Sequence, residues 1–320
     1  MMKLSNNVGE RQHRKSKTVH GHGWLLIDKC AGWTSAQVVG KVRSLLQIRK
    51  AGHAGTLDPL ATGLLPVALG EATKTIPFLV ENLKTYKFVV RWGEARDTDD
   101  AEGMVVARSD KRPTECEIRA ALTEFRGEIL QRPPNYSAIK INGKRAYELA
   151  RAKLPLTLKE RRVRVERLDL LDVLDKDSAV FELHCGKGVY VRSIARDLGK
   201  TLGAEGHVGE LRRMRVGSFD IGAAISLAQL EELKDIGGLA GRLLPLAEGL
   251  AGVPVVCIDT EQASRLRHGQ PVPLVTAPKD CGGRIEAPAL VCAVLAKRPV
   301  ALVDFSGGEI RPRRVFNYGA

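Results

Sequence analysis

The irregular mixture of strand-like and helix-like segments constrains the fold most. Apolar and polar residues alternate from Tyr86 to Trp92 and from Ala179 to Cys185, and this period of two predicts strands. The run Trp24 to Ile27 predicts a third, buried strand. Three helical patterns are preceded by capping boxes, which begin at Thr34, Thr114 and Ser226. This mixture predicts an α+β fold and not a doubly wound parallel sheet.

Two glycine-rich segments connect these elements. Residues 51–70 combine Gly, Pro and Thr and predict a long structured loop. Gly186-Lys187-Gly188 predicts a turn that leads directly into a helix. The apolar side of that helix is formed by residues at helical spacing: Val191, Ile194, Ala195, Leu198 and Leu202.

The two ends of the chain differ from the middle. Residues 1–22 are polar and basic and predict a disordered arm. After Gly252, short apolar runs alternate with Gly, Pro and polar turns, which predicts a small β-rich domain over residues 253–320. Its strands are expected at Val255–Ile258, Val291–Leu295 and Val300–Val303.

The charge is basic and unevenly distributed. The chain has 50 Lys and Arg against 37 Asp and Glu, a formal net charge of +13. Residues 140–167 hold ten basic side chains and only three acidic ones, Glu148, Glu160 and Glu166. A concentrated basic segment is an electrostatic footprint for nucleic acid, although a solvated basic face has the same composition.

The sequence gives no support for a membrane protein, a secreted protein or a metal-binding protein. No apolar run approaches the length of a membrane span, and the N-terminus has no apolar signal segment, so we expect a cytoplasmic protein. The six cysteines are scattered and are expected to be reduced thiols. No Cys or His spacing predicts a metal site.

One carboxylate lies in an unusual loop, Gly52–Gly63. Pro59 favours an extended backbone at Asp58, and the glycines permit close approach, so the loop presents Asp58 in a defined pose. An Asp before Pro is also an ordinary turn residue, and composition leaves both readings open. The acidic stretch 97–103 lacks the glycine and glutamate of a calcium loop, so we expect a solvated acidic turn.

With this loop as its centre, the chain resembles the TruB family, the bacterial tRNA pseudouridine-55 synthases. Five segments carry the resemblance: Gly23–Lys29 with Gly32, Thr34 and Ser35; Gly52–Gly63; Lys84-Thr85-Tyr86; Gly186–Arg192; and Leu211-Arg212-Arg213. It covers about residues 23–250, and residues 253–320 more weakly resemble the family's PUA-like domain.

The resemblance implies a fold and a reaction. Residues 23–252 are expected to form a pseudouridine-synthase domain with a mixed, mainly antiparallel sheet and flanking helices. A basic RNA-gripping insertion is expected at about 134–160, and an RNA-binding PUA-like domain at 253–320. The implied reaction isomerises uridine-55 in the T arm of tRNA to pseudouridine, after the base is flipped out. It needs no cofactor and no metal, and we expect a monomer that binds tRNA, requires no protein partner and does not contact a membrane.

The resemblance also assigns residues. The implied catalytic residues are Asp58, Tyr86, whose ring stacks on the base with its hydroxyl near C5, and Arg192, which pairs with Asp58. Whether Asp58 adds covalently or abstracts a sugar proton stays open. The implied substrate-binding residues are Lys29, His53, Lys187, Tyr190 and Leu211. The implied RNA-backbone residues are Lys140, Lys144, Arg145 and Arg212.

Two positions depart from the family, and two alternatives remain. Cys30 replaces the usual proline, which loosens that turn, and Val189 replaces a common threonine, which removes one hydrogen bond. A non-catalytic tRNA-binding or tRNA-folding protein would use the same scaffold without Asp58, Tyr86 and Arg192 acting together. A guide-RNA-dependent relative is disfavoured by the modest length and by the lack of a long lysine-rich tail.

Overall fold

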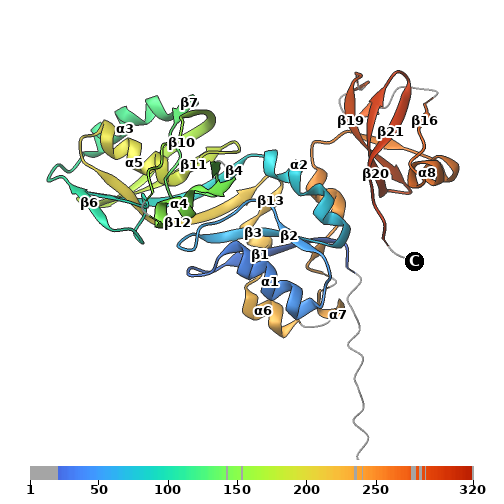
Figure 1. Ribbon diagram of the computed structural model, residues 1–320, viewed down its shortest axis with the longest axis horizontal. Coiled ribbons are helices and arrows are strands. Elements are labelled where there is room, and N and C mark those ends of the chain that lie inside the picture. The colour runs from blue at the N-terminus through green and yellow to red at the C-terminus, as the bar shows by residue number, and fades with distance from the viewer. Residues whose placement is uncertain are drawn as a thin grey trace, which may run out of the picture.

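A ten-stranded mixed sheet runs through the larger part of the molecule (Figure 1). The computed structural model describes residues 21–141, 143–152, 154–233, 236–239, 241–274, 279–280, 283–284 and 286–318. The strand order is β14-β1-β3-β12-β4-β11-β10-β7, with β2 beside β3 and β13 beside β12. Every neighbouring pair is antiparallel except β3 and β12. The predicted mainly antiparallel α+β fold is therefore confirmed.

The strands of this sheet are β1 (Gly23–Lys29), β2 (Ala51–His53), β3 (Thr62–Leu69), β4 (Lys84–Trp92), β7 (Gly127–Gln131), β10 (Arg161–Asp175), β11 (Ser178–Cys185), β12 (Gly206–Val216), β13 (Phe219–Asp220) and β14 (Leu243–Leu244). The helices of the chain are α1 (Ser35–Leu46), α2 (Ile76–Glu81), α3 (Glu115–Ala121), α4 (Ala146–Arg151), α5 (Val191–Thr201), α6 (Leu227–Glu232), α7 (Ile236–Leu239) and α8 (Thr260–Arg267). Short 3-10 helices are η1 (Gly70–Thr75), η2 (Leu122–Phe125), η3 (Ile221–Ala223) and η4 (Leu246–Leu250).

Local sequence signals set most of these boundaries. The predicted capping boxes at Thr34, Thr114 and Ser226 are all present at the starts of α1, α3 and α6. The apolar side of α5 packs on the inner sheet face, where Phe88 of β4 stacks on Phe181 of β11 with ring centroids 5.4 Å apart. This packing fixes α5 against the strands that carry Tyr86 and Leu211.

The prediction that residues 51–70 form only a loop was wrong. β2 and β3 lie there, and β3 is buried along nearly its whole length between β1 and β12. Pro66 lies within β3 although it has no N–H to donate to a neighbouring strand. Its carbonyl instead accepts a hydrogen bond from Ala54 at 3.0 Å, and the apolar residues around it fill the core. Only the part from Ala54 to Ala61 is loop.

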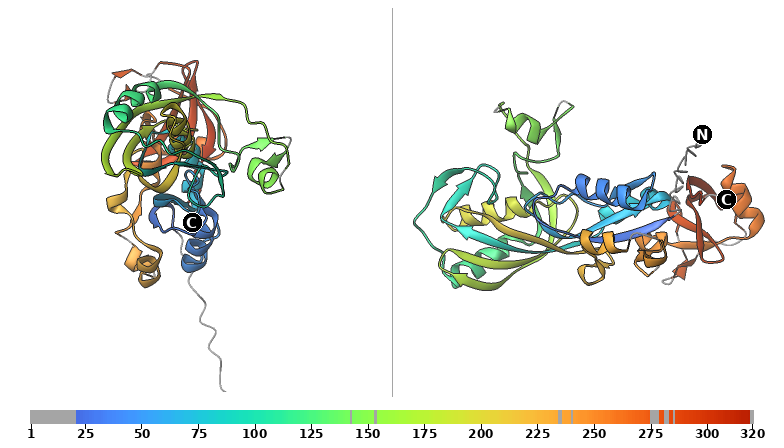
Figure 2. Two further views of the ribbon diagram at one scale, coloured as in Figure 1. Left: turned by 90° about the vertical axis from the view of Figure 1, so that its left-hand side faces the viewer. Right: turned by 90° about the horizontal axis from the view of Figure 1, so that it is seen from below.

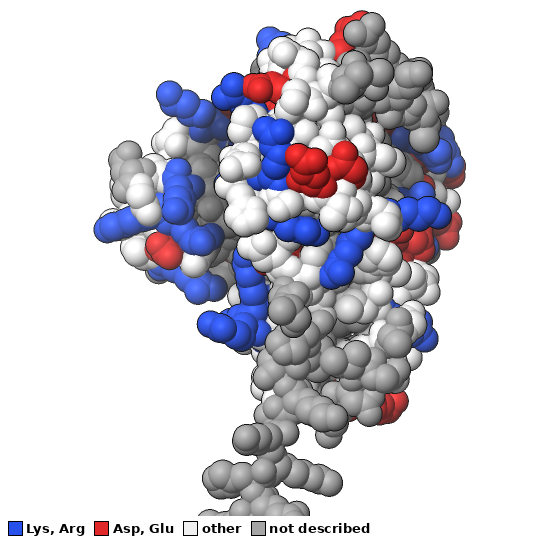
Figure 3. All heavy atoms as spheres, turned by 90° about the vertical axis from the view of Figure 1, so that its right-hand side faces the viewer, with Lys and Arg blue, Asp and Glu red and all other residues white. Residues whose placement is uncertain are grey.

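The C-terminal region forms a separate five-stranded sheet in the order β15-β19-β20-β21-β16 (Figure 1). Its strands are β15 (Val255–Cys257), β16 (Val272–Pro273), β19 (Ala289–Leu295), β20 (Arg298–Ser306) and β21 (Glu309–Val315). A two-stranded pair, β17 (Lys279–Asp280) and β18 (Gly283–Arg284), lies beside them in sequence. All three strands predicted in this region are present. Lys and Arg outnumber Asp and Glu on the face seen in Figure 3.

Two small hairpins extend from the main sheet. One is formed by β5 (Glu94–Arg96) and β6 (Val105–Arg108). The other, β8 (Lys140–Ile141) and β9 (Lys144–Arg145), carries α4 and projects from the body of the molecule (Figure 2). This projection coincides with the basic insertion expected at about 134–160.

The predicted arm over residues 1–22 extends too far. Residues 1–20 lie outside the described part of the chain. His22 instead packs against the C-terminal region, because its Nε2 lies 3.1 Å from the Tyr318 carbonyl and its Nδ1 accepts a hydrogen bond from the Glu71 N–H. Among the described residues, no helix is long and apolar enough to span a membrane.

Candidate active site

The loop that carries Asp58 is tied to α1 and β1 on both sides of the aspartate. Ser35 at the start of α1 bonds both the N–H and the carbonyl of Leu57, at 2.8 and 3.0 Å. The carbonyl of Pro59 accepts from the Gly32 N–H at 2.9 Å. With its neighbours in the chain fixed in this way, Asp58 has little backbone freedom.

Lys29, which was expected to bind substrate, strengthens the same attachment. The side chain is fully buried, and its ammonium donates to the carbonyls of Cys30, Trp33 and Pro59 at 3.0, 2.7 and 3.1 Å. An ammonium has three N–H donors, so all are used. Burial lowers the pKa of Lys29. Lys29 therefore supports the loop, and it is not among the residues that line the cavity beside Asp58.

Arg192 of α5 holds the Asp58 carboxylate. Its Nε donates to Asp58 Oδ2 at 2.9 Å, as the resemblance implied. Its two other nitrogens donate to the carbonyls of Thr98 at 2.8 Å and Tyr136 at 2.9 Å. The Arg192 side chain is 5% exposed and that of Asp58 is 36% exposed. The arginine is thus fixed, while the carboxylate is open to a bound molecule.

The acidic stretch 97–103 is part of this arrangement, and the prediction of a solvated turn was wrong. Asp99 and Asp100 are 8% and 3% exposed. Asp100 Oδ2 lies 3.6 Å from Arg192 Nε, and its Oδ1 accepts from the Thr98 hydroxyl at 2.6 Å. The arginines of α5 compensate these buried charges, and sequence spacing alone gave no sign of that pairing.

A cavity of about 260 Å³ opens beside the carboxylate. Its wall includes Asp58, Tyr86, Tyr190, Arg192 and Leu211, which come from the loop, β4, the start of α5 and β12. Burial raises the pKa of Tyr86, so its hydroxyl stays protonated at neutral pH. The cavity therefore combines one open carboxylate with aromatic and aliphatic walls, which suits a flat, weakly polar ring.

Arg213 is a cavity residue that sequence reasoning did not select. It is 1% exposed, pairs across the strands with Tyr86, and donates to the carbonyls of Leu64 at 2.8 Å and Gly55 at 3.1 Å. The sequence pattern that could have identified Arg213 is the alternation of side chains along a strand, which puts Leu211 and Arg213 on one face and Arg212 on the other. Arg212 accordingly forms a two-point ion pair with Asp28, at 3.0 and 2.7 Å, and does not line the cavity.

Of the other expected substrate-binding residues, some line the cavity and one does not. Tyr190 lines the cavity, and its backbone is held by Gln131 through bonds of 2.8 and 3.2 Å. Lys187 also lines it, but its ammonium pairs with Glu81 at 2.7 Å. His53 ends β2 outside the cavity lining, and burial lowers its pKa so that it is neutral at pH 7.

The expected RNA-backbone residues of the insertion lie together on the projecting hairpin. Lys140, Lys144 and Arg145 are all exposed. Within the described part of the chain, none of the three forms an ion pair with a carboxylate. Lys153 of the same basic segment lies outside the described residues.

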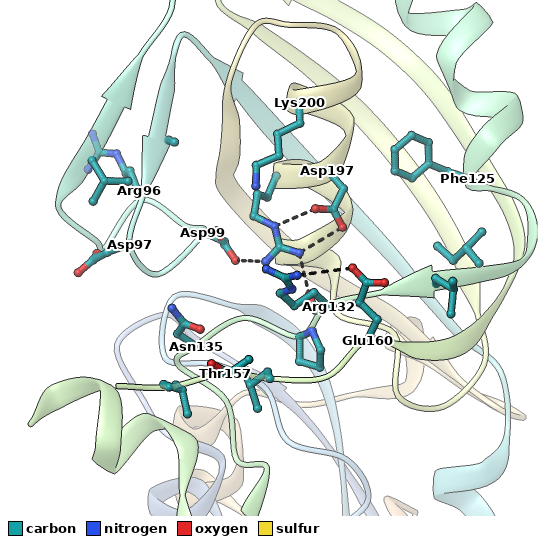
Figure 4. Close-up of a pocket in the computed structure, with 18 of the residues that line it drawn as sticks. Arg96, Asp97, Asp99, Phe125, Arg132, Asn135, Thr157, Glu160, Asp197 and Lys200 are labelled. Atoms are coloured by element: carbon teal, nitrogen blue, oxygen red, sulfur yellow. Dashed lines mark hydrogen bonds and ion pairs between the residues drawn. The ribbon is translucent and has the colours of Figure 1, made fainter. Parts of the chain in front are cut away.

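A larger cavity, about 950 Å³, lies beside Arg196 and Asp197 of α5 (Figure 4). Its lining includes neither Asp58, Tyr86 nor Arg192. Acidic side chains outnumber basic ones there: Asp97, Asp99, Glu124, Glu128, Glu160 and Asp197 against Arg96, Arg132, Arg196 and Lys200. The smaller cavity is the candidate active site, because it brings Asp58, Tyr86 and Arg192 together.

Comparison with known proteins gives consistent matches. Residues 43–191 match the family model described as TruB family pseudouridylate synthase (N terminal domain). Residues 192–251 match the one described as tRNA pseudouridylate synthase B C-terminal domain. Proteins named tRNA pseudouridine synthase B are similar along nearly the whole chain. That of Cereibacter sphaeroides is 49% identical, covering 95% of this chain and 98% of its own. That of Bradyrhizobium diazoefficiens is 48% identical, covering 97% and 89%.

Solved structures share the fold. The chain superimposes on a structure titled "Crystal Structure of a Cbf5-Nop10-Gar1 Complex" with a TM-score of 0.72 and 26% identity, covering 94% of this chain and 88% of that one. A second, "Structure of H/ACA RNP bound to a substrate RNA containing 2'-deoxyuridine", gives a TM-score of 0.70 at 24% identity, covering 92% and 85%. At that identity the second likeness concerns the fold alone.

Proposed function

The chain belongs to the TruB family of tRNA pseudouridine synthases, and from this premise we propose that it converts uridine-55 in the T arm of tRNA to pseudouridine. The observation that carries the proposal is the open Asp58 carboxylate, held by Arg192 at the edge of a ring-sized cavity. A protein that only bound tRNA would need no such carboxylate.

The reaction rearranges bonds without a change in composition. The C1′–N1 bond of the uridine breaks, the uracil turns, and a C1′–C5 bond forms. C5 then loses its hydrogen to solvent, and N1 takes up a proton. The step requires a carboxylate at the C1′ side of the sugar and walls that retain the detached ring.

Asp58 supplies the carboxylate in this proposal, either as a nucleophile at C1′ or as a base toward a sugar proton. Arg192 orients it through Nε, and the two backbone carbonyls that Arg192 also binds prevent the guanidinium from rotating. Such preorganisation lowers the cost of charge rearrangement, because no solvent has to reorient when the reaction occurs.

Tyr86, Tyr190 and Leu211 would retain the uracil. The phenol ring of Tyr86 gives a stacking surface, and its protonated hydroxyl is available as a hydrogen-bond donor. Leu211 closes an apolar side of the cavity. The target base must leave its stack to enter, at a cost of a few kcal/mol that RNA contacts elsewhere have to offset.

The remaining tRNA contacts are assigned to two basic surfaces. The exposed Lys140, Lys144 and Arg145 of the projecting hairpin would bind phosphates of the T arm. The C-terminal sheet would serve as a PUA-like domain that holds a more distant part of the tRNA. All proposed site residues come from one chain, so the proposal requires a monomer only, and a tRNA substrate implies a cytoplasmic protein.

The test is tritium release from tRNA labelled at uracil C5. Wild-type protein is expected to release tritium, and Asp58→Asn to lose turnover while its tRNA affinity stays within a few fold. Asp177→Asn is a matched control, because Asp177 pairs with Arg112 and lies outside the cavity lining.

Normal release by Asp58→Asn would refute the assignment of the carboxylate. Absence of release by wild type, with tight tRNA binding measured in parallel, would identify the chain as a tRNA-binding protein that has lost the reaction.

A further inference from the structure

Two arginines one helical turn apart on α5 connect the same pair of segments. Arg192 donates to Thr98 in the acidic turn and to Tyr136 at the base of the insertion. Arg196 donates to Asp99, the next residue of that turn, at 2.8 Å and to the Arg132 carbonyl at 2.7 Å. Positions i and i+4 of a helix share a face, so the two arginines form successive crosslinks.

Figure 4 shows the second crosslink at the wall of the larger cavity, where Asp99 and Asp197 converge on one guanidinium. The Arg196 and Asp99 side chains are 13% and 12% exposed. An ion pair with so little solvent is screened weakly, so it restrains its partners more than a surface pair does.

Asp99 adopts an unusual backbone conformation. Its φ is +61°, in the left-handed region that non-glycine residues rarely occupy. Its carbonyl accepts from the Val208 N–H at 3.1 Å, and the Ala101 N–H donates back to Val208 at 2.9 Å. Such a conformation persists only where the surroundings hold it, and the Arg196 pair is the side-chain part of that restraint.

We propose that Asp99 and Arg196 are positioning residues for pseudouridine formation. They hold the acidic turn 97–103 and the base of the insertion in place, so that Arg192 Nε stays directed at the Asp58 carboxylate. The inference rests on the proposed function. Arg192 can present Nε to Asp58 only while the Thr98 and Tyr136 carbonyls stay where they are. Asp99 adjoins Thr98 in the chain, and Arg132, whose carbonyl also accepts from the Ser193 hydroxyl at 2.8 Å, precedes Tyr136 closely. The second crosslink therefore helps to hold both acceptors.

Asp197 offers a control on the same guanidinium. Its carboxylate also pairs with Arg196, at 2.8 Å, but it belongs to α5 and does not connect the helix to the turn. Removing it takes away a charge beside Arg196 and leaves the crosslink to Asp99 in place.

The experiment compares Asp99→Ala, Arg196→Ala, the double variant and Asp197→Asn in single-turnover tritium release with saturating enzyme. Asp99→Ala and Arg196→Ala are each expected to slow the step at least about tenfold, because small misplacements of an orienting group cost up to about a hundredfold. The affinity of these variants for tRNA should stay within about threefold of the wild-type affinity. The single-turnover rate of Asp197→Asn should stay within about twofold of the wild-type rate. The double variant should be no slower than Arg196→Ala, because the paired residues act as one unit.

A second readout does not depend on activity. The nitrogen-15 signal of the Arg192 Nε–H, identified by its loss in Arg192→Lys, reports the bond to Asp58. It should shift in Asp99→Ala and stay unchanged in Asp197→Asn. If Asp99→Ala does not fold, Asp99→Asn, which keeps the shape, is read in the same way.

Wild-type rates in Asp99→Ala, an equal loss in Asp197→Asn, or additive losses in the double variant would each overturn the proposal. If wild type itself releases no tritium, the proposed function fails. The Nε–H signal then still decides whether the Asp99–Arg196 pair positions Arg192.

Discussion

Lys84 buries an amine in the wall of the candidate active site. It is 6% exposed and donates to the carbonyls of Val80 and Asn82 at the end of α2. Burial lowers the pKa of Lys84 from 10.5 to about 8. A charged ammonium in this position therefore lowers the free energy of unfolding. The ammonium also donates hydrogen bonds to two carbonyls at the end of α2, where the helix itself supplies no donors.

This cost predicts a pH dependence of stability. Between pH 8 and 10.5 the unfolded chain keeps the Lys84 proton that the folded protein has lost, so the contribution of Lys84 to the free energy of unfolding rises with pH. Relative to Lys84→Met, wild type should gain roughly 2 kcal/mol between pH 7 and pH 10. Chemical unfolding of both proteins at the two pH values measures this difference, and other titrating groups cancel. A constant difference would contradict the lowered pKa.

The roles of single residues were predicted well where a sequence motif determines the role, and poorly where only the geometry of the fold determines it. The bond between Asp58 and Arg192 was implied before the structure, although the two residues lie 134 positions apart in sequence. The contacts of Lys29 could not be predicted, because the sequence gives no sign that three carbonyls surround its ammonium. Arg212 was selected as a site residue and Arg213 was not, although strand alternation puts their side chains on opposite faces and only Arg213 lines the cavity.

Among the elements, the parallel strands β3 and β12 pair at Gly63, where the backbone of β12 leaves no space for a side chain. Gly63 has a φ of +96°, and a Cβ there would lie 2.3 Å from the backbone oxygen of Arg213. Gly63→Ala should destabilise the protein by about 3 kcal/mol or more, because it combines strain with a backbone clash. Gly127→Ala separates the two effects, since Gly127 has a φ of +80° but open space around it. Equal losses of unfolding free energy in both variants would show that the clash contributes nothing.

The projecting hairpin gives a second prediction at this scale. Replacing Lys140, Lys144 and Arg145 by Gln should weaken tRNA binding and reduce the slope of log affinity against log salt by up to about three, one for each phosphate that is no longer neutralised. The control replaces Arg108, Lys111 and Arg119, which are paired with glutamates elsewhere and carry the same total charge. An unchanged slope in the hairpin variant, or an equal change in the control, would place the RNA interface elsewhere.

Periodicity identified the helices and most strands because these patterns are local. It missed β3 because Gly63 and Pro66 are turn signals that tertiary packing overrides. It misread the acidic turn for a related reason, since the partners of Asp99 and Asp100 lie on α5, far along the chain. Segments whose conformation depends on distant partners carry no local signal.

For the whole molecule, the change of composition after Gly252 predicted where a second sheet begins but not how it attaches. One buried cluster contains Trp24, Leu26 and Leu64 of the large sheet together with Leu302 and Phe316 of the C-terminal region. Polar contacts accompany it: Lys74 donates to the Val315 carbonyl at 2.6 Å, and the Asn317 N–H donates to Glu71 at 2.8 Å. The two sheets therefore share part of a hydrophobic core, which a linker would not provide.

This shared core predicts that the two parts stabilise each other. Phe316 is 2% exposed within the shared cluster, whereas Phe305, 5% exposed, belongs to the separate core of the C-terminal sheet. Each Phe→Ala change should cost about 3–5 kcal/mol where the side chain is buried. Only Phe316→Ala disturbs the buried cluster to which Trp24 belongs, so it should lower the midpoint of thermal unfolding detected by tryptophan fluorescence more than Phe305→Ala does.

Tryptophan emission isolates the larger part, because all three tryptophans, Trp24, Trp33 and Trp92, precede residue 252. Circular dichroism followed in the same samples reports both sheets and shows that each variant is destabilised. A loss of about 3 kcal/mol corresponds to roughly 6–12 °C for a unit of 150–250 residues, which the fluorescence transition resolves easily. Equal shifts of that transition in the two variants would mean that the molecule unfolds as one unit, whichever core is damaged. A shift confined to Phe316→Ala would locate the coupling in the shared cluster.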